Sequence, residues 1–594
     1  MLITNKFKLP SHYKDILLLF FLASVIFISI QNSYSWYLKN ITPFGDPFTY
    51  ELGFYYLLDT IQNKGYWEGF KRIFANWYWL QNSLIWLFSP FLSKSTNVLC
   101  VINFICYALS SIAIYRFFIS FDETKKIIAL ILSSSVWVFP INYTFHEYSS
   151  ILVMGLDSSF IGSLIGLGFS GVLLLKRPNS FFENIFFIIF FGMSFYGRGN
   201  SLLVVGSVLF IPFVFFVLEF FKKNITINLI NFLFISFSIL SIISLFYYIL
   251  GKNILEYYEV HKYFLNTQVF SIKKTLIYIT NIPGIFFFYP KPDQINLMNN
   301  YSYIVIIFSI LSHILVLLSF FKIIFLKSNK YLKLICINGF FVFYITLIVN
   351  ILMWQHEHIT IYNAQLIFAP MRIGLLMTVL PFLFLLFEKR KFHLTASKVL
   401  LVVFFALYSF TLSNYYKDWS KPKSPDPIKI SEVAEYIYKN INDKGYTILI
   451  YGLYNPNIFN YYRLRNNQPE LKLFYPKHYN DIWIQLQNEE VIKNTRKGLN
   501  EIFTGSDLII IPDKSTFYKN SKGSRYSYYL NQDIFVEELS KQIFNFNLIG
   551  KIIENDYNLL ILKRDSKNNS NFEFKFDQDT YEIIALNEKS LIVF

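Results

Sequence analysis

The stretch NSLLVVGSVLFIPFVFFVLEFF (residues 200–221) decides the fold class, together with NLINFLFISFSILSIISLFYYIL (228–250). Each run is as long as the roughly 20 mainly apolar residues that a helix needs to cross a bilayer core. Between them lies a short polar segment with Lys222-Lys223. Two such runs joined by a basic turn predict a pair of transmembrane helices.

The composition of the whole chain agrees with this pattern. Of its 594 residues, 54% are hydrophobic and 20% aromatic, and only 16% are charged. Soluble domains carry about 25% charged residues, and one water-soluble core cannot bury this excess of apolar side chains. The composition excludes a collagen-like, disordered or disulfide-stapled protein, and it excludes a soluble enzyme as the whole chain.

Apolar runs of this kind predict a polytopic α-helical membrane protein with about 11 transmembrane helices. The short run at 181–196 is the weakest of them. The expected spans are 16–32, 96–118, 126–142, 156–175, 181–196, 200–221, 228–250, 301–321, 334–353, 370–388 and 395–414.

The net charge of +15 has its explanation in the turns between these spans. Basic clusters precede the first span and recur at every second junction, as in Lys176-Arg177 and Lys389-Arg390-Lys391. Cytoplasmic loops carry such an excess of Lys and Arg. We therefore expect a multi-pass protein of the cell (inner) membrane with a cytoplasmic N-terminus, an extracytoplasmic C-terminal domain and no nucleic-acid partner.

Two domains are expected. Residues 1–420 form the transmembrane domain with a long outer loop at 33–95, whose Trp-rich stretches suit interfacial helices. After a Pro-rich linker, residues 421–594 have the composition of a soluble extracytoplasmic α/β domain. Its expected elements are helices at 430–441 and 530–545, strands at 447–451, 508–511 and 558–563, and added strands or a tail in the last 25 residues or so.

Four charged residues at the expected outer mouths are the first candidates for chemistry. Asp46 follows the first span, Asp157 opens the fourth, Arg198 precedes the sixth and Arg372 opens the tenth. A charge at such a depth is costly unless it faces a polar cavity or a partner. Structural Asp–Arg pairing is the alternative interpretation of each one.

Histidines in two outer loops are further candidates. His356-Glu357-His358 is not the H-E-x-x-H zinc motif, and residues two apart diverge on a helix. His146-Glu147 has the same ambiguity. We favour interfacial loops that contact substrate over a divalent-metal site, and we expect no cofactor.

A G-x-G-x-x-G pattern at Gly166, Gly168 and Gly171 has a simpler explanation. A dinucleotide site needs this motif between a strand and a helix, whereas here it lies within an expected span. Small residues allow close packing of membrane helices. We interpret the glycines as packing positions.

The order of these residues resembles the GT-C superfamily of glycosyltransferases, closest to its protein mannosyltransferase and aminoarabinose transferase branch. The resemblance starts in the first outer loop with Asp46, Tyr50, Gly65-Tyr66-Trp67 and the helix expected over 77–90. It continues as weak, spaced motifs through Gly155-Leu156-Asp157-Ser158, Arg198-Gly199 and Arg372 with Pro381.

What the resemblance implies is transfer of a sugar from a polyprenyl-phosphate carrier to a lipid, glycan or protein acceptor at the outer face, with inversion. Asp46 would be the general base, and Asp157 would complete the catalytic pair. The expected substrate-binding residues are Tyr50, Glu51, His146, Glu147, Arg198, His356 and Arg372.

Two other classes are alternatives. A polysaccharide polymerase or ligase would use a long central outer loop rich in Arg, but the 251–300 loop has Lys and no Arg. A non-enzymatic glycolipid transporter would show inverted repeats or matching Gly/Pro-broken helices, and neither stands out in this sequence.

Overall fold

The computed structural model describes most of residues 46–388 and the strands of the C-terminal part. The described ranges are 46–73, 79–92, 98–138, 156–197, 201–266, 303–325, 328–353, 369–388, 447–450, 472–474, 503–512, 545–554, 557–564, 572–577 and 580–585, with isolated residues between 272 and 280 and between 464 and 542. The chain divides into two compact units, residues 1–37 with 57–421 and residues 38–56 with 422–594.

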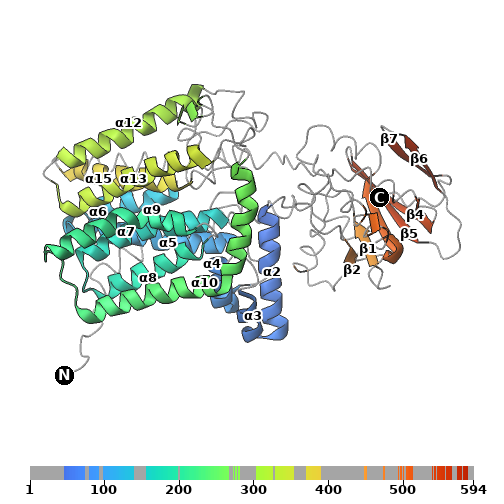
Figure 1. Cartoon of the computed structure of the whole chain (residues 1–594), viewed down its shortest axis with the longest axis horizontal. Coiled ribbons are helices and arrows are strands. Elements are labelled where there is room, and N and C mark those ends of the chain that lie inside the picture. Colours follow the sequence, from blue (N-terminus) through green and yellow to red (C-terminus); the bar gives the residue numbers. More distant parts are fainter. Residues whose placement is uncertain are drawn as a thin grey trace. The chain divides into compact units, whose positions relative to one another are not determined.

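Nine of the eleven expected spans coincide with described helices of the first unit. The expected spans at 16–32 and 395–414 lie outside the described residues. The nine helices, shown in Figure 1, are α5 (Val98–Ile119), α6 (Lys126–Val138), α7 (Leu156–Lys176), α8 (Phe181–Phe195), α9 (Ser201–Phe221), α10 (Leu229–Asn266), α12 (Tyr303–Phe325), α13 (Lys330–Met353) and α15 (Ala369–Glu388).

Four of these helices are long and apolar enough to cross a membrane: α5, α9, α10 and α13. Shorter apolar stretches lie on α7, α8, α12 and α15. Large apolar side chains such as Phe213, Phe237 and Leu318 are exposed along α9, α10 and α12. Because lipid is the environment that suits such surfaces, the chain is a multi-pass membrane protein.

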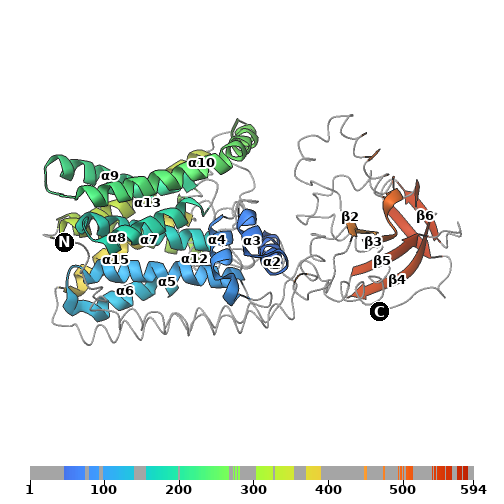
Figure 2. The ribbon, with the colours of Figure 1, turned by 90° about the horizontal axis from the view of Figure 1, so that it is seen from below.

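The turns with basic residues gather at one end of the bundle, here called the basic end. Lys176 Nζ at the end of α7 donates to the Ser120 carbonyl after α5 at 2.5 Å. The turn after α7 is held to the turn before α10, since Asn179 donates to the Thr226 carbonyl at 3.0 Å. Figure 2 shows the α5–α6 and α9–α10 turns at the same end of the bundle.

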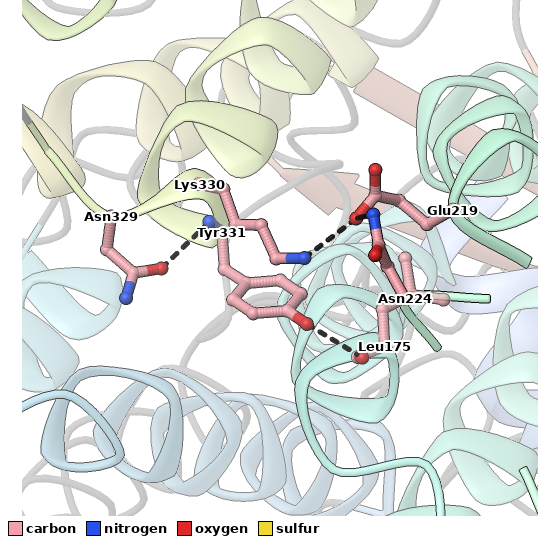
Figure 3. Close-up of polar contacts among 6 residues, drawn as sticks. All are labelled: Leu175, Glu219, Asn224, Asn329, Lys330 and Tyr331. Carbon is pink, nitrogen blue, oxygen red and sulfur yellow. Dashed lines mark hydrogen bonds and ion pairs between the residues drawn. The ribbon is translucent and has the colours of Figure 1, made fainter. Parts of the chain in front are cut away.

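Figure 3 shows how α13 joins this end. Lys330 Nζ lies 2.7 Å from a carboxylate oxygen of Glu219 on α9, and Asn224 donates to the same oxygen at 3.4 Å. The Tyr331 hydroxyl donates to the Leu175 carbonyl of α7 at 3.3 Å. These contacts connect the basic turns next to α7, α9 and α13, which the sequence predicted to lie on one side of the bundle.

Helix α10 is longer than the sequence predicted. We expected a span ending near residue 250, but the helix continues to Asn266. Hydropathy falls at Gly251-Lys252-Asn253, yet 251–266 contains no Pro to interrupt the backbone hydrogen bonds. Apolar length marks the extent of the hydrocarbon core and does not fix where a helix ends.

Helices also form in the expected outer loop. They are α2 (Asp46–Lys64), α3 (Tyr66–Arg72), α4 (Trp79–Phe88) and the 3-10 turn Ser89–Phe91. Of these, α3 and α4 lie at the other end of the bundle, here called the distal end. Gly65 has φ +99°, a conformation that side chains disfavour, and this allows the turn between α2 and α3. Leu80 of α4 donates its backbone N–H to the Tyr196 carbonyl after α8 at 3.4 Å.

The second unit contains a five-stranded mixed sheet in the order β2-β1-β3-β5-β4. Strands β1 (Thr447–Ile450), β3 (Leu508–Pro512) and β5 (Tyr557–Arg564) lie where strands were predicted. Strands β2 (Lys472–Phe474) and β4 (Phe546–Glu554) were not predicted. Strands β6 (Phe572–Asp577) and β7 (Thr580–Ala585) form a separate antiparallel pair in the region where added strands or a tail were expected. The helix expected at 430–441 and most of the one expected at 530–545 lie outside the described residues.

Candidate functional site

Arg372 is the one charged side chain of the predicted site whose surroundings the described part of the chain shows. It lies in the first turn of α15 and is 1% exposed, which makes it the largest fully buried side chain of that part. Burial of a guanidinium within a membrane helix bundle carries a large desolvation cost. A buried charge is stabilised when polar or anionic groups lie next to it.

Tyr107 of α5 is a second buried polar residue in the distal half of the bundle. Its side chain is completely buried. Asn103, one turn earlier on α5, is also completely buried. Buried polar side chains therefore lie in the distal halves of both α5 and α15, within an otherwise apolar bundle.

Helix α7 fixes the relative heights of these residues. A Cβ added at Gly162 would lie 3.3 Å from the Tyr107 ring, so Tyr107 is level with Gly162. A Cβ at Gly168 would lie 2.7 Å from Met377 Sδ, so α15 contacts α7 at that height. The G-x-G-x-x-G glycines thus lie within a helix and at helix contacts, and their interpretation as packing positions is confirmed.

The same contacts place Asp157 along α7. Helices α5, α7 and α15 all run from the distal end to the basic end, where Phe384 of α15 stacks on Phe118 of α5 at 4.9 Å. At a rise of 1.5 Å per residue, the backbone of Asp157 lies about 16 Å from that of Gly168 toward the distal end, and the backbone of Arg372 lies about 8 Å from that of Met377 in the same direction. The backbone of Arg372 is therefore about one and a half turns below that of Asp157, in the layer of Tyr107.

The first-loop residues lie on α2. Asp46 is the first residue of this helix, and Tyr50 and Glu51 follow one turn later. A carboxylate at a helix N-terminus is favoured by the helix dipole. Residues 38–56 belong to the second compact unit, so the structure groups Asp46, Tyr50 and Glu51 with one another and gives no relation between them and Arg372.

The remaining predicted residues are Arg198, His146, Glu147 and His356. All four lie outside the described residues, and their roles stay predictions. Within the described ranges, no group of three or more His, Cys, Asp or Glu side chains is placed to hold a metal ion.

Sequence reasoning missed the polar stripe of α5. Asn103, Tyr107, Ser110 and Ser111 follow one another at helical spacing. The stripe faces α7, since the Ser110 hydroxyl donates to the Gly162 carbonyl. Polar residues at i, i+4, i+7 and i+8 within an apolar run were the available signal, because such a stripe marks the interior face of a membrane helix.

Comparison with known proteins yields a likeness in structure alone. No family model matches the chain, and no curated protein sequence does. The chain is similar to crystal structures of ArnT from Cupriavidus metallidurans, at TM-score 0.39 for the form bound to undecaprenyl phosphate and 0.38 for the apo form. Both share 10% sequence identity with it; the alignments cover 94% and 91% of this chain and 99% and 97% of the ArnT chains. At these values the likeness assigns no role to any residue.

Proposed function

We propose that this protein is a membrane glycosyltransferase that moves a sugar from a polyprenyl-phosphate carrier to a lipid, glycan or protein acceptor. The observation that carries the proposal is Arg372, a buried guanidinium in the first turn of α15 and at the height of Gly162 on α7. It is supported by the order of acidic, aromatic and basic motifs from Asp46 to Arg372.

Arg372 suits a lipid phosphate as a ligand. A guanidinium presents paired N–H donors that match phosphate oxygens, and it stays charged at every physiological pH. An anion held at the distal end of the bundle by a lipid tail would reach this charge from within the bilayer. The phosphate would in turn offset the cost of burying Arg372.

The chemistry follows from the donor. A sugar on a lipid phosphate already has a good leaving group, so the enzyme needs cations for the departing phosphate and a base for the acceptor hydroxyl. Arg372 and Arg198 would hold the phosphate. Asp46 would take the proton of the acceptor hydroxyl as its oxygen attacks the anomeric carbon from the face opposite the phosphate, which inverts that centre.

Other residues would place the two substrates. Asp157, about one and a half turns above Arg372 at the start of α7, would orient the acceptor or an arginine. Tyr50 and Glu51, one turn after Asp46, would line the acceptor side. His146, Glu147 and His356 would contact substrate from the outer loops.

Envelope glycans of matched strains test the proposal. Four strains are compared: wild type, a gene deletion, Asp46→Asn and Asp59→Asn. Asp59→Asn is the control, because it removes a carboxylate from the same helix. The amount of the protein in the membrane is matched between the strains that express it. A general base contributes about 10²–10⁴-fold, so Asp46→Asn should lose the same single sugar as the deletion while Asp59→Asn keeps it. A glycan altered by deletion but intact in Asp46→Asn would remove Asp46 from the mechanism.

The orientation is part of the proposal. The basic end would face the cytoplasm and the distal end the outside, which puts the N-terminus inside and residues 421–594 outside the cell membrane. A cysteine at the exposed Arg177 position should react with a membrane-impermeant maleimide in inverted vesicles and not in intact cells. Labelling in intact cells would reverse the topology.

A further inference from the structure

We infer that Asn338 of α13 is a positioning residue: it replaces a backbone hydrogen bond that Pro212 removes from α9, and it thereby sets the direction of the distal half of that helix. Arg198, a proposed ligand of the lipid phosphate, precedes α9 by three residues in the sequence. The consequence for carrier binding rests on the proposed function, whereas the replacement of the hydrogen bond does not.

Pro212 interrupts the backbone hydrogen bonds of α9. It lies inside the helix Ser201–Phe221 and is buried. In an α-helix the N–H of residue 212 would donate to the carbonyl four residues earlier, which is that of Val208, but proline has no N–H. Val208 is itself completely buried. A carbonyl left unpaired inside a membrane bundle is strongly unfavourable, so this one needs a donor from another helix.

Asn338 supplies that donor. Its side-chain Nδ2 donates to the Val208 carbonyl at 2.7 Å, across 130 residues of sequence, and Asn338 is completely buried. Among the described residues, the other polar atom of this side chain, Oδ1, has no hydrogen-bond partner. Because burial of an amide is unfavourable unless the amide is hydrogen-bonded, the contact with Val208 is the physical reason for an asparagine at this place.

Helix α13 holds α9 on both sides of the proline. On the basic side, the ring centres of Phe215 and Tyr331 lie 6.0 Å apart, and Lys330 is paired with Glu219 (Figure 3). These contacts fix the half of α9 that follows Pro212. The direction of the other half then depends on what holds it to α13.

Two contacts do so in the turn before Pro212. One is the hydrogen bond from Asn338 to Val208, and the other is the stacking of Phe210 on Phe341, with ring centres 5.4 Å apart. Stacked rings can slide over one another, whereas a hydrogen bond of 2.7 Å fixes both distance and direction. Asn338 therefore sets the angle between the two halves of α9.

A small change of this angle becomes a large displacement at the start of α9. Pro212 and Ser201 are separated by about 17 Å at the rise of an α-helix. Because kinks at proline commonly exceed 20°, a change of about 20° would move the start of the helix by about 6 Å. Arg198, three residues before Ser201, would move with it and would no longer reach the same phosphate oxygens.

A double-variant cycle tests the replacement of the hydrogen bond. Unfolding temperatures in detergent are measured for wild type, Asn338→Leu, Pro212→Ala and the combined variant. Asn338→Leu alone should lower the unfolding temperature by about 1–3 °C, because the Val208 carbonyl loses its donor. Pro212→Ala restores the backbone N–H, so Asn338→Leu should cost much less in that background. An equal loss in both backgrounds would refute the replacement.

Asn184→Leu is the matched control for this cycle. Asn184 of α8 is also completely buried, and neither polar atom of its side chain has a hydrogen-bond partner among the described residues. Its replacement should leave the unfolding temperature unchanged or raise it, with or without Pro212→Ala.

Carrier binding tests the positioning role. Native mass spectrometry compares the binding of undecaprenyl phosphate and of undecaprenol, its neutral alcohol, to the full-length protein. Wild type should prefer the phosphate, and Arg198→Gln should reduce this preference about tenfold, as expected for the loss of a hydrogen bond between charged groups. Asn338→Leu should cause a similar reduction with binding of the alcohol unchanged. In the Arg198→Gln background, Asn338→Leu should reduce the preference no further.

The outcomes separate the two ideas. If wild type shows no preference for the phosphate, the proposed carrier chemistry fails and the positioning role fails with it, while the unfolding temperatures still decide whether Asn338 replaces the bond lost at Pro212. If Arg198→Gln loses the preference and Asn338→Leu keeps it, the carrier site stands and the positioning role is refuted. A further tenfold loss when Asn338→Leu is added to Arg198→Gln would also refute it, since the two residues would then act independently.

Discussion

Glu183 in the first turn of α8 lies 2.5 Å from Arg116 in the last turn of α5, across 67 residues of sequence. The Glu183 side chain is 2% exposed and the Arg116 side chain 13%. The guanidinium also lies 4.1 Å from the centre of the Phe182 ring. One buried ion pair thus connects α5 to α8 at the basic end.

Removing one partner of this ion pair should lower the free energy of unfolding. Arg116→Ala leaves the Glu183 carboxylate buried without its cation, and such changes destabilise by about 3–5 kcal/mol. Thermal unfolding in detergent measures the loss. The double variant Arg116→Met/Glu183→Leu should recover most of it, because no charge is then left buried; a double variant as unstable as Arg116→Ala would contradict this account.

Gly374 should not tolerate a side chain. A Cβ there would stand 2.5 Å from the Phe343 nitrogen and 2.6 Å from the Gly339 oxygen, both backbone atoms of α13 that cannot turn aside. Gly374→Ala should therefore destabilise the bundle by about 1–3 kcal/mol or more. Gly206→Ala is the control, because nothing lies within 4 Å of its added Cβ, and it should leave the unfolding temperature unchanged or raise it.

Replacement of Lys223 with glycine should increase the stability of the protein. It follows α9 with φ 60°, and its N–H donates to the Phe220 carbonyl at 2.9 Å while that of Asn224 donates to Glu219 at 2.9 Å. This helix-ending pattern favours glycine at the left-handed position. Lys223→Gly should raise stability by up to about 1 kcal/mol, whereas Lys222→Gly, one residue earlier, should lower it.

The turn between α5 and α6 should weaken in acid. The Thr124 hydroxyl and backbone N–H donate to the Asp122 carboxylate at 2.6 and 2.9 Å, which lowers the pKa of Asp122 to about 2 from 3.8. A lowered pKa contributes stability above the unfolded value, and that contribution is lost as the pH falls from about 4 toward 2. The difference in unfolding temperature between wild type and Asp122→Asn should therefore be largest near pH 6 and shrink below pH 4; a constant difference would show that the charge is irrelevant.

The spans were predictable because the bilayer imposes a simple rule on sequence. Apolar length located the helices from α5 to α15, and the recurrence of Lys and Arg grouped their turns at one end before any contact was known. The strands Leu508–Pro512 and Tyr557–Arg564 were predictable from continuous or alternating apolar residues. Strand β2, with three residues, is too short for such a pattern.

The candidate site was predictable only as a set of positions along the chain. Asp157 and Arg372 were placed at the starts of spans and Asp46 in the first outer loop, and each is found in the first turn of a helix. Their roles stay predictions. The buried polar stripe with Asn103 and Tyr107 was missed, since single polar residues within an apolar span do not show which face of the helix is buried until the packing is known.

Hydrophobic length and charge act locally along the backbone, and for this reason the amino-acid sequence alone identifies a membrane protein with alternating basic turns. Which distant residues meet depends on the folded bundle: Arg116 lies against Glu183, and Lys330 against Glu219 across 111 residues. Those pairings depend on which helices pack together and at what height. Contacts such as Gly162 against α5 and Gly374 against α13 set these heights, and no pattern within one helix specifies them.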